Sequence, residues 1–368
     1  MVSSSGKVFV ALSGGVDSST TAALLCQKGF DCAGVFMMTS DQACRAQEDA
    51  EKVAKKLGMK LYVLDLRRNF ERILDYFCSE YKQGRTPNPC IFCNRYIKFG
   101  RLWDFARGNG ADFLATGHYA RILDTRNWLD GYQLSITSYQ SPAISVGLYE
   151  AADVAKDQSY ALSMIDKAIL PYVILPMGEY SKARIKEMAA EFGLGIERKK
   201  ESQEICFIPN NDYVAVLEER CPELVRSGDI VDSSGKILGR HNGVHRFTIG
   251  QRRGLRVAMG RPYYVVKIDA QTNTVTLGPK EEVMHRRLTA TAVNWLTDRP
   301  QSRFRAKVKI RYNDEGASAM VSPQDSSIAV EFDEPISAIT PGQLAVLYVQ
   351  EAGNNRVVGG GWIDKVSD

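Results

Sequence analysis

A short loop near the start of the chain combines two glycines with hydroxyl and carboxyl side chains. It reads Ser13-Gly14-Gly15-Val16-Asp17-Ser18-Ser19 and stands between an apolar run and a helical pattern. Glycines let the backbone approach an anion, and a helix N-terminus offers N–H donors and partial positive charge. Asp17 suits such a loop if it binds Mg²⁺ carried by a nucleotide. An ordinary capped glycine turn explains the glycines but not the whole heptapeptide, so the loop predicts a nucleotide site.

The loop has neither the Gly-Lys-Ser/Thr of a Walker A sequence nor the Gly-x-Gly-x-x-Gly spacing of a dinucleotide site. It resembles the SGGxDS loop of the N-type ATP pyrophosphatases, which cleave ATP between the α and β phosphates and adenylate an oxygen atom. Enzymes that form amides, form guanidines or insert sulfur share this loop. The loop alone therefore leaves the substrate open.

Two cysteine motifs make sulfur a candidate nucleophile. The first is TPNPCIFCN, a proline-bounded loop at 86–94 that leads into a helix expected to begin near Asn94. Cys93 is then expected at a helix N-terminus, where the dipole together with Lys98 and Arg95 lowers the pKa of a thiol.

The second motif is ESQEICFI at 201–208, which contains Cys206. Two thiols distant in sequence could meet across a cleft, where one carries a persulfide and the other releases its sulfur by forming a disulfide. A lone Cys-x-x-Cys is as often half of a metal site or a redox pair, and Cys206 could be a buried apolar residue. The remaining cysteines have no partner motif and are interpreted as structural: Cys26, Cys32, Cys44, Cys78 and Cys221.

The elements that must position these residues alternate between strand and helix. The alternation predicts a parallel sheet with right-handed crossovers, whose ligands lie beyond the carboxyl ends of the strands. Both the Ser13 loop and the stretch 116–119 occupy such ends. The segment 124–155 has no clear period and is expected to be an inserted hairpin or excursion. Strands are predicted at 7–12, 31–37, 60–65 and 112–116, and helices at 17–28, 42–57, 69–82, 94–107 and 181–192.

The second half of the chain has a different sequence pattern and contains a strongly basic segment. Residues 236–320 contain 17 Lys and Arg against 6 Asp and Glu, a net charge of +11, whereas the whole chain carries +4 and its remainder therefore −7. This bias indicates a polyanionic partner, although a strand-rich domain with basic solvent faces explains it equally well. Short β-branched runs between turn residues predict small antiparallel sheets or a barrel, at 263–268, 274–277, 288–293, 304–310, 328–332 and 344–349.

Length and composition exclude several classes of protein. A chain of 368 residues exceeds one ordinary hydrophobic core, so two or three domains are expected. No apolar run approaches the roughly 18 residues of a spanning helix, and the start is too short and Ser-rich for a signal peptide. Eight cysteines dispersed through ordinary sequence indicate reduced thiols, so the expected compartment is the cytoplasm, with no membrane partner.

Six motifs occur together and in order: SGGVDSS, PNPCIFCNRYIKFG, ATGHYAR, KDQSYAL, ESQEICFI and FTIGQRRGL. Together they resemble the tRNA-specific 2-thiouridylase family over nearly the whole chain. The resemblance implies an α/β fold: a parallel-sheet ATP pyrophosphatase domain, similar to the adenine nucleotide alpha hydrolases, at 1–210. A small central β-rich domain is implied at 211–283, and a C-terminal antiparallel β-barrel that binds tRNA at 284–368.

The resemblance also implies roles for individual residues. Cys93 is the implied nucleophile, and Cys206 the implied persulfide carrier. ATP is expected to contact Ala11, Leu12, Ser13, Gly14, Gly15, Val16, Asp17 and Ser18, with Met37 and Gly117 at the adenosine. The implied contacts with tRNA are Asn88, Pro89, Cys90, His118, Lys156, Asp157 and Gln158, and in the barrel Arg311, Tyr312 and Gln343.

The implied reaction begins when O2 of the wobble uridine attacks the α-phosphate of ATP, with Asp17 holding Mg²⁺. Sulfur from Cys206 then displaces AMP at C2, and Cys93 resolves the persulfide through a Cys93–Cys206 disulfide. A persulfide donor protein and an external reductant are required. Many family members have Asp where this chain has Cys90. With Cys90, the three thiols also suit a [4Fe–4S] cluster with one open iron, or zinc, although the persulfide route is preferred.

Two other functions stay open. A different ATP pyrophosphatase could adenylate a small carboxylate or ureido group and add ammonia, a reaction that needs neither thiol. A non-enzymatic module that binds RNA or metal through a degenerate nucleotide site is the third, and the intact Ser13, Asp17 and Ser18 disfavour it.

Overall fold

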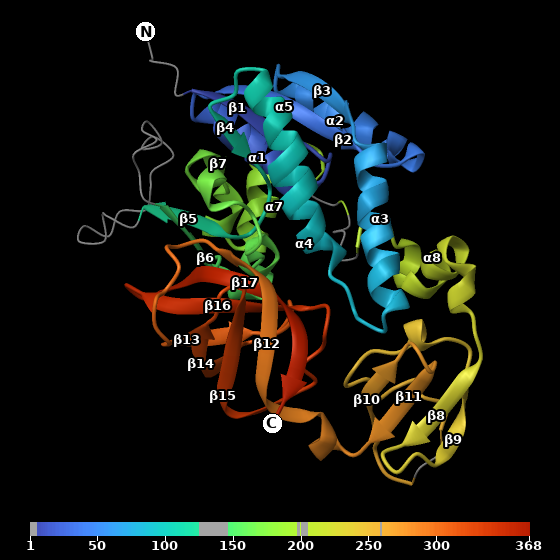
Figure 1. Ribbon diagram of the computed structural model, residues 1–368. Coiled ribbons are helices and arrows are strands. Elements are labelled where there is room, and N and C mark those ends of the chain that lie inside the picture. The colour runs from blue at the N-terminus through green and yellow to red at the C-terminus, as the bar shows by residue number, and fades with distance from the viewer. Residues whose placement is uncertain (1–5, 125–145, 197–198, 200–204, 258–259) are drawn as a thin grey trace.

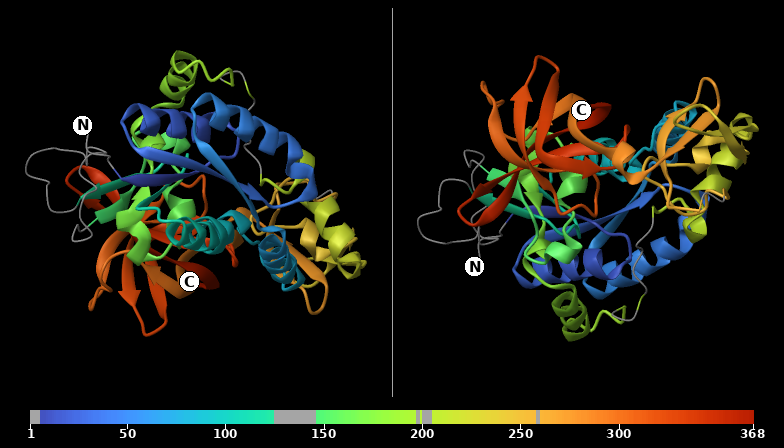
Figure 2. Two further views of the ribbon diagram at one scale, coloured as in Figure 1. Left: turned by 90° about the horizontal axis from the view of Figure 1, so that it is seen from above. Right: turned by 90° about the horizontal axis from the view of Figure 1, so that it is seen from below.

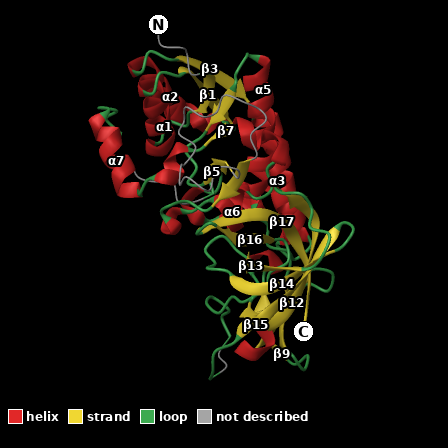
Figure 3. Ribbon diagram, turned by 90° about the vertical axis from the view of Figure 1, so that its left-hand side faces the viewer, coloured by secondary structure: helices red, strands yellow, loops and turns green. Residues whose placement is uncertain are grey.

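The computed structural model describes residues 6–124, 146–196, 199, 205–257 and 260–368. It has three parts (Figure 1): an α/β part around a parallel sheet and, below it in that view, a closed barrel and a small four-stranded sheet. The view from below in Figure 2 shows the barrel and the small sheet side by side. Figure 3 shows that the helices gather around the parallel sheet, whereas the barrel is built of strands. No helix among the described residues is long and apolar enough to cross a membrane.

The parallel sheet has the strand order β3-β2-β1-β4-β7. The chain places β2 and β3 on one side of β1 and then crosses to β4 on the other side. The strand order therefore reverses between β1 and β4, which is where sheets of this kind bind ligands. The four predicted strands are confirmed, and β7 is too short to give a sequence signal. The bounds are β1 (Lys7–Ala11), β2 (Asp31–Met38), β3 (Lys60–Asp65), β4 (Phe113–Ala115) and β7 (Val173–Ile174).

Helices cover both faces of this sheet because β1 alternates its apolar side chains. Val8 and Val10 face the core that α1 and α2 cover, and Phe9 faces the core that α5 covers. Ser181 caps α7 by accepting a hydrogen bond from the amide of Arg184, as its sequence predicts. The bounds are α1 (Val16–Gln27), α2 (Cys44–Lys56), α3 (Arg67–Lys82), α5 (Leu102–Gly108), α6 (Ser159–Leu162) and α7 (Lys182–Glu191).

The helix that carries the first cysteine motif begins one turn earlier than predicted. It runs as α4 (Pro89–Cys93), a π-helical segment η2 (Asn94–Arg101) and then α5 without a break. Pro89 occupies the first turn, where its missing N–H costs nothing. The proline-bounded motif is therefore the start of the helix and not a loop before it, so the prediction of a start near Asn94 is wrong.

The predicted excursion at 124–155 is partly a core hairpin. Its strands β5 (Arg121–Asp124) and β6 (Val146–Tyr149) pair in antiparallel register, and β6 also pairs with β17 of the barrel. Leu148 and Tyr149 are fully buried, so this stretch belongs to the core, contrary to the expectation. Residues 125–145 of the segment lie outside the described residues.

A helix and a small sheet follow the α/β part. The sheet has the order β10-β11-β8-β9, and its β11–β8 pair is parallel, so it is not the purely antiparallel sheet predicted. Its core is apolar, with Val265, Val275 and Leu277 fully buried. The bounds are α8 (Tyr213–Arg220), β8 (Gly228–Asp232), β9 (Ile237–His241), β10 (Tyr264–Asp269) and β11 (Thr274–Gly278).

The C-terminal strands form the predicted barrel. They follow the order β12-β15-β14-β13-β16-β17, and pairing of β12 with β17 closes the ring. Inward-facing β-branched residues such as Val308, Val321 and Ile328 fill the interior. The bounds are β12 (Met284–Trp295), β13 (Phe304–Lys309), β14 (Ala317–Pro323), β15 (Ser327–Ser337), β16 (Leu344–Glu351) and β17 (Asn354–Ser367).

Candidate active site

The loop at residues 13–19, called the phosphate loop from here on, lies at the point where the strand order reverses. It connects β1 to α1, and Gly117 follows the neighbouring strand β4. A Cβ on Gly117 would lie 2.8 Å from the backbone nitrogen of Ser18, so glycine is needed for the two strand ends to come together. The two predicted loops therefore share one edge of the sheet.

The loop forms a cradle open to an anion. Ser18 Oγ accepts a hydrogen bond from the Ser13 amide at 3.2 Å and lies 3.1 Å from Ser13 Oγ. Gly14 has a φ of +71°, and a Cβ there would lie 2.8 Å from the carbonyl oxygen of Ala46. No side chain among the described residues caps α1, so its first amides remain available as donors. A nucleotide phosphate suits this cradle.

Asp17 is paired with a lysine that sequence reasoning missed. Lys182 Nζ lies 2.6 Å from Asp17 Oδ1, and the Tyr119 hydroxyl donates to the same oxygen at 2.5 Å. Lys182 also lies 5.4 Å from the centre of the Tyr119 ring. Because Lys182 is the first residue of α7, its charge opposes the helix dipole. That unfavourable position was the available sequence signal for an acidic partner of Lys182.

A second lysine reaches the loop from the chain that precedes Cys206. Lys199 Nζ donates to the Gly14 carbonyl at 3.0 Å and to Asp49 Oδ2 at 2.6 Å. Its hydrogen bond lowers the pKa of Asp49. Lys199 thus links the phosphate loop to α2, while residues 201–204 of the second cysteine motif lie outside the described residues.

Three cysteines lie around Lys98. Cys90 and Cys206 are exposed and Cys93 is partly buried, and the Lys98 ammonium favours the thiolate of each. The ring of Phe207 packs edge-on against α3 and so places its neighbour Cys206 there. The two cysteine motifs, distant in sequence, therefore meet beside one cation.

The pKa of Cys93 is raised to about 11, although a lowered value was expected. Burial outweighs the nearby charge of Lys98. Because the helix begins at Pro89, Cys93 also lies in its second turn, beyond the first turn in which the dipole acts. The surrounding protein raises the pKa of Cys90 and of Cys206 as well, even though water reaches both side chains. All three sulfurs are therefore protonated at neutral pH.

The three thiols were also considered as ligands of a [4Fe–4S] cluster or of zinc. Over the part of the chain that the structure describes, no group of three or more His, Cys, Asp or Glu side chains is placed to hold a metal ion. The choice between a cluster and a persulfide on Cys90, Cys93 and Cys206 therefore stays a prediction.

His118 connects the thiols to the phosphate loop. Its Nε2 lies 3.2 Å from Lys98 Nζ, and its Nδ1 lies 2.7 Å from Thr116 Oγ1. An ammonium can only donate, so Nε2 accepts and the proton of the neutral ring is on Nδ1, donated to Thr116. Burial, followed by the Lys98 charge, holds the pKa of His118 well below its ordinary value. His118 therefore fixes the lysine beside the thiols while Gly117 contacts the loop.

Barrel residues reach the first cysteine motif. Gln343 Nε2 donates to the carbonyl oxygens of Thr86 and Pro87, at 2.8 and 3.2 Å, and so holds the chain that enters α4. Arg311 and Tyr312 are exposed, and the pKa of Tyr312 is raised by burial and by nearby acidic groups. Of the predicted tRNA contacts on the motif itself, Asn88 is partly buried, Pro89 buried and Cys90 exposed.

Asp157, another predicted tRNA contact, lies at the junction of the α/β part with the barrel. Its carboxylate accepts hydrogen bonds from the amides of Ala151 and Ser159. Lys309 of β13 lies 3.7 Å from it and 2.6 Å from the buried carboxylate of Glu150. The Asp157 carboxylate therefore faces a buried lysine and not an exposed surface. Its neighbours Lys156 and Gln158 are partly buried.

The predicted adenosine residues are apolar and lie beside the loop. Leu12 and Val16 are buried at the two ends of the loop, and Ala11 and Met37 are partly buried near the ends of β1 and β2. They provide an apolar wall next to the phosphate cradle.

Three family models match consecutive parts of the chain. They are described as a tRNA methyl transferase HUP domain at 6–210, a tRNA methyl transferase PRC-barrel domain at 215–279 and an aminomethyltransferase β-barrel domain at 285–363.

Curated relatives match over almost the full length. A protein of Carboxydothermus hydrogenoformans named tRNA-specific 2-thiouridylase MnmA is 43% identical over 98% of this chain and 98% of its own. Proteins of the same name are 40% identical in Clostridium perfringens, over 98% of this chain and 99% of that one, and 42% identical in Syntrophotalea carbinolica, over 97% and 98%. Among solved structures, a 4-thiouridine synthetase in complex with RNA and ATP is 20% identical over 59% of this chain and 51% of that one. Its TM-score of 0.36 is too low to bear on function.

Proposed function

The chain belongs to the tRNA-specific 2-thiouridylase family, and from that membership we propose that it is a tRNA sulfurtransferase that makes 2-thiouridine at the expense of ATP. The observation that carries the proposal is the meeting of two cysteine motifs around Lys98. The histidine bound to that lysine directly follows the glycine that packs on the phosphate loop.

The descriptions of the matched family models name methyltransferases, whereas the relatives at about 40% identity are named 2-thiouridylases. The site favours thiolation. Methyl transfer requires a bound methyl donor but neither a phosphate cradle nor a pair of thiols. Thiolation uses both, because the cradle activates the base and the thiols deliver the sulfur.

In the first step, O2 of the uridine attacks the α-phosphate of ATP. The Pα–O bond to pyrophosphate breaks, N3 of the base gives up its proton to water, and the base carries AMP on O2. Gly14 and Gly15 let the backbone approach the phosphates, and the amides at the start of α1 donate to the charge that develops on them. The chain positions the nucleotide with backbone groups, so this step needs no protein nucleophile.

Asp17 is the residue proposed to hold Mg²⁺. Its Oδ1 contacts Lys182 and Tyr119, and Oδ2 has no hydrogen-bond partner among the described residues. When bound, Mg²⁺ neutralises phosphate charge, and one carboxylate with phosphate oxygens is an ordinary ligand set for it. Lys182 is then placed to donate to a phosphate oxygen.

In the second step, the terminal sulfur of a Cys206 persulfide attacks C2 of the uridine, and the C2–O bond to AMP breaks. The base is then joined to Cys206 by a disulfide. The Cys93 thiolate attacks the Cys206 sulfur, which releases 2-thiouridine and leaves a Cys93–Cys206 disulfide. A reductant supplies two electrons to reopen it, and a persulfide donor protein reloads Cys206. Lys98 stabilises the thiolates on which this exchange depends.

The proposed division of the chain is a catalytic domain at 1–210, a central domain at 211–283 and a barrel at 284–368. The family models change near both boundaries, which supports the division. The segment 236–320 has a net charge of +11 and contains three of the four strands of the central sheet and about half of the barrel. We assign the phosphate backbone of tRNA to these two parts, because basic surfaces supply most of the affinity for nucleic acid.

The test is mass spectrometry of the nucleosides of tRNA after incubation with the protein, ATP, Mg²⁺ and a persulfide source. We expect 2-thiouridine to appear with AMP and pyrophosphate in equal amounts. Its absence under conditions in which a characterised relative is active would defeat the proposal.

A further inference from the structure

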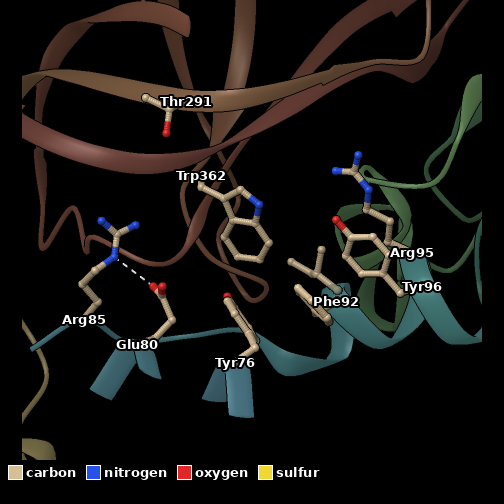
Figure 4. A pocket seen from close by; sticks show the side chains of 9 residues that line it. Tyr76, Glu80, Arg85, Phe92, Arg95, Tyr96, Thr291 and Trp362 are labelled. Atoms are coloured by element: carbon tan, nitrogen blue, oxygen red, sulfur yellow. Dashed lines mark hydrogen bonds and ion pairs between the residues drawn. The ribbon is translucent and has the colours of Figure 1, made fainter. Parts of the chain in front are cut away.

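A cavity of about 220 Å³ lies between α3, the cysteine-bearing helix and the barrel. We call it the aromatic pocket. It is lined by Tyr76, Phe92, Tyr96 and Trp362, with Arg95 at one edge and the ion pair of Arg85 with Glu80 at the other. Figure 4 shows Trp362 of β17 pointing across the cavity toward the rings of Tyr76 and Phe92. None of these residues has a role in the reaction described above.

The rings of the pocket form a stacking surface. Tyr76 and Phe92 are stacked, with ring centres 4.6 Å apart and planes inclined by 12°. Phe92 is also 4.4 Å from Tyr96, and Tyr76 is 5.7 Å from Trp362. Tyr96 is 44% exposed, so a ligand can reach its ring from solvent.

Cations accompany the rings. The Arg95 guanidinium lies 5.3 Å from the centre of the Tyr96 ring. A second recess shares Phe92, Arg95 and Tyr96 with the first. It is also lined by Arg72 and Arg101, against one carboxylate, that of Asp104. The ligand that suits both recesses is therefore flat and aromatic at one end and negatively charged at the other.

A nucleotide of single-stranded RNA has this chemistry. RNA-binding proteins recognise unstacked bases by stacking them on aromatic rings or guanidinium planes, and basic groups follow the phosphates. The cavity is smaller than the roughly 300–1,000 Å³ of pockets for drug-sized ligands, which suits a single base. A protein partner would instead need an interface of roughly 800 Å² on each side.

The pocket lies beside the thiols but is not their site. Phe92 lies between Cys90 and Cys93 in the helix, but none of the three cysteines is among the residues that line the pocket. A base in the pocket therefore lies against aromatic rings and not against a reactive sulfur, so it is not the base that reacts. A neighbouring nucleotide of the same strand can reach it.

We propose that the aromatic pocket binds a nucleobase of the RNA substrate other than the uridine that is thiolated. This inference rests on the proposed function, because it requires an RNA substrate. By stacking this second base, the pocket pulls the strand open and holds the target uridine beside the thiols.

The test uses the full-length protein and a fluorescent anticodon stem-loop RNA with a wobble uridine. Dissociation constants are measured for Tyr96→Ala, Tyr96→Phe, Trp362→Phe and Val63→Ala, a control whose side chain is as exposed as Tyr96 but lies on β3. Each protein is also tested with RNAs in which one loop nucleotide at a time, apart from the target, is abasic.

Loss of one stacking contact should weaken binding by Tyr96→Ala roughly 5- to 150-fold. Tyr96→Phe and Val63→Ala should bind within about twofold of the unaltered protein. At one abasic position the difference between Tyr96→Ala and the unaltered protein should vanish, which identifies the stacked base. Trp362→Phe should retain most of the affinity, and a folded Tyr96→Ala is verified by its unchanged circular dichroism.

Equal binding by Tyr96→Ala and the unaltered protein would overturn the proposal, as would a loss that persists at every abasic position. If Tyr96→Ala binds RNA normally but accepts sulfur from a protein donor poorly, the pocket serves a protein and the proposal is wrong. These outcomes are distinct from failure of the proposed function, in which the unaltered protein forms no 2-thiouridine.

Discussion

Lys182 Nζ lies 2.6 Å from Asp17 Oδ1, so the carboxylate proposed to hold Mg²⁺ already has a cation of the protein beside it. The Lys182 side chain is only 11% exposed, so this pair is shielded from solvent more than a surface ion pair. Without nucleotide, the lysine balances the charge of Asp17. With Mg²⁺ on Asp17, the same ammonium lies beside the phosphates and can donate a hydrogen bond to them.

Replacing Lys182 with Met should therefore impair the activation step. A charge-assisted hydrogen bond contributes about 1.5–3 kcal/mol, so kcat/KM for ATP should fall roughly 10- to 150-fold, measured by pyrophosphate release. Lys182→Arg should recover part of the loss. Lys52→Met, an exposed lysine on α2, is the matched control and should behave as the unaltered protein. An unchanged KM and kcat in Lys182→Met would show that Lys182 serves only the fold.

The sulfur-transfer step, which uses the two proposed thiols, should be separable by mutation from the adenylation step. Cys93→Ser and Cys206→Ser should each abolish 2-thiouridine formation while pyrophosphate release continues, because the first step uses no protein sulfur. Cys44→Ser, an exposed cysteine on α2, should leave both products unaffected. Full thiolation by either active-site variant would instead favour an ATP pyrophosphatase of another kind.

The reactivity of Cys93 should depend on pH in a defined direction. Since its pKa is raised to about 11, the thiol form prevails at pH 7, and alkylation by iodoacetamide should accelerate about tenfold per pH unit up to pH 11. Lys98→Met removes the charge that favours the thiolate, so the pKa should rise further and alkylation at pH 9 should slow. Peptide mass spectrometry assigns the modified sulfur, and Lys55→Met is the control. Faster alkylation in Lys98→Met would contradict this account.

The lysine buried at the junction should matter for stability. Removing one partner of a buried ion pair costs about 3–5 kcal/mol, because the carboxylates of Glu150 and Asp157 would remain uncompensated. Lys309→Met should lower the free energy of unfolding in urea by about that amount. Lys307→Met, on the same strand but not fully buried, should cost less than 1 kcal/mol. A small effect at Lys309 would mean that the junction relaxes without it.

The cluster-free sulfur route makes a prediction of its own. Protein purified without oxygen should contain iron and sulfide far below one cluster per chain, and Cys90→Ala should retain 2-thiouridine formation. Stoichiometric iron and sulfide that are lost in Cys90→Ala would replace the persulfide route with a cluster.

Elements with a strong local pattern were predictable from sequence. The apolar run of β1, the heptapeptide after it and the Ser181 cap of α7 all depend on residues adjacent in the chain. The start of the cysteine-bearing helix could not be predicted in this way. The prolines indicated a loop, but Pro89 lies in the first turn of the helix, where proline is favoured. Strand β17 was missed because Gly359, Gly360 and Gly361 interrupt its β-branched pattern.

The electrostatics of the site were the least predictable part. The raised pKa of Cys93 results from burial, which no short sequence window reports. Likewise, Lys182 lies 165 residues from Asp17, and Gln343 lies 257 residues from the Thr86 carbonyl that it binds. Such contacts depend on how the parts pack, and local patterns carry little information about them.

Two late contacts have a consequence for the synthesis of the protein. They are the pairing of β17 with β6 and the hydrogen bonds from Gln343 to the chain before α4. During translation, the phosphate loop and both cysteine motifs leave the ribosome more than 130 residues before the last strand does. Until Gln343 is made, the chain before α4 lacks the hydrogen bonds that hold it, and until β17 is made, β6 lacks its second strand partner. A chain cut short by premature termination therefore retains every reactive residue but lacks the scaffold that aligns them.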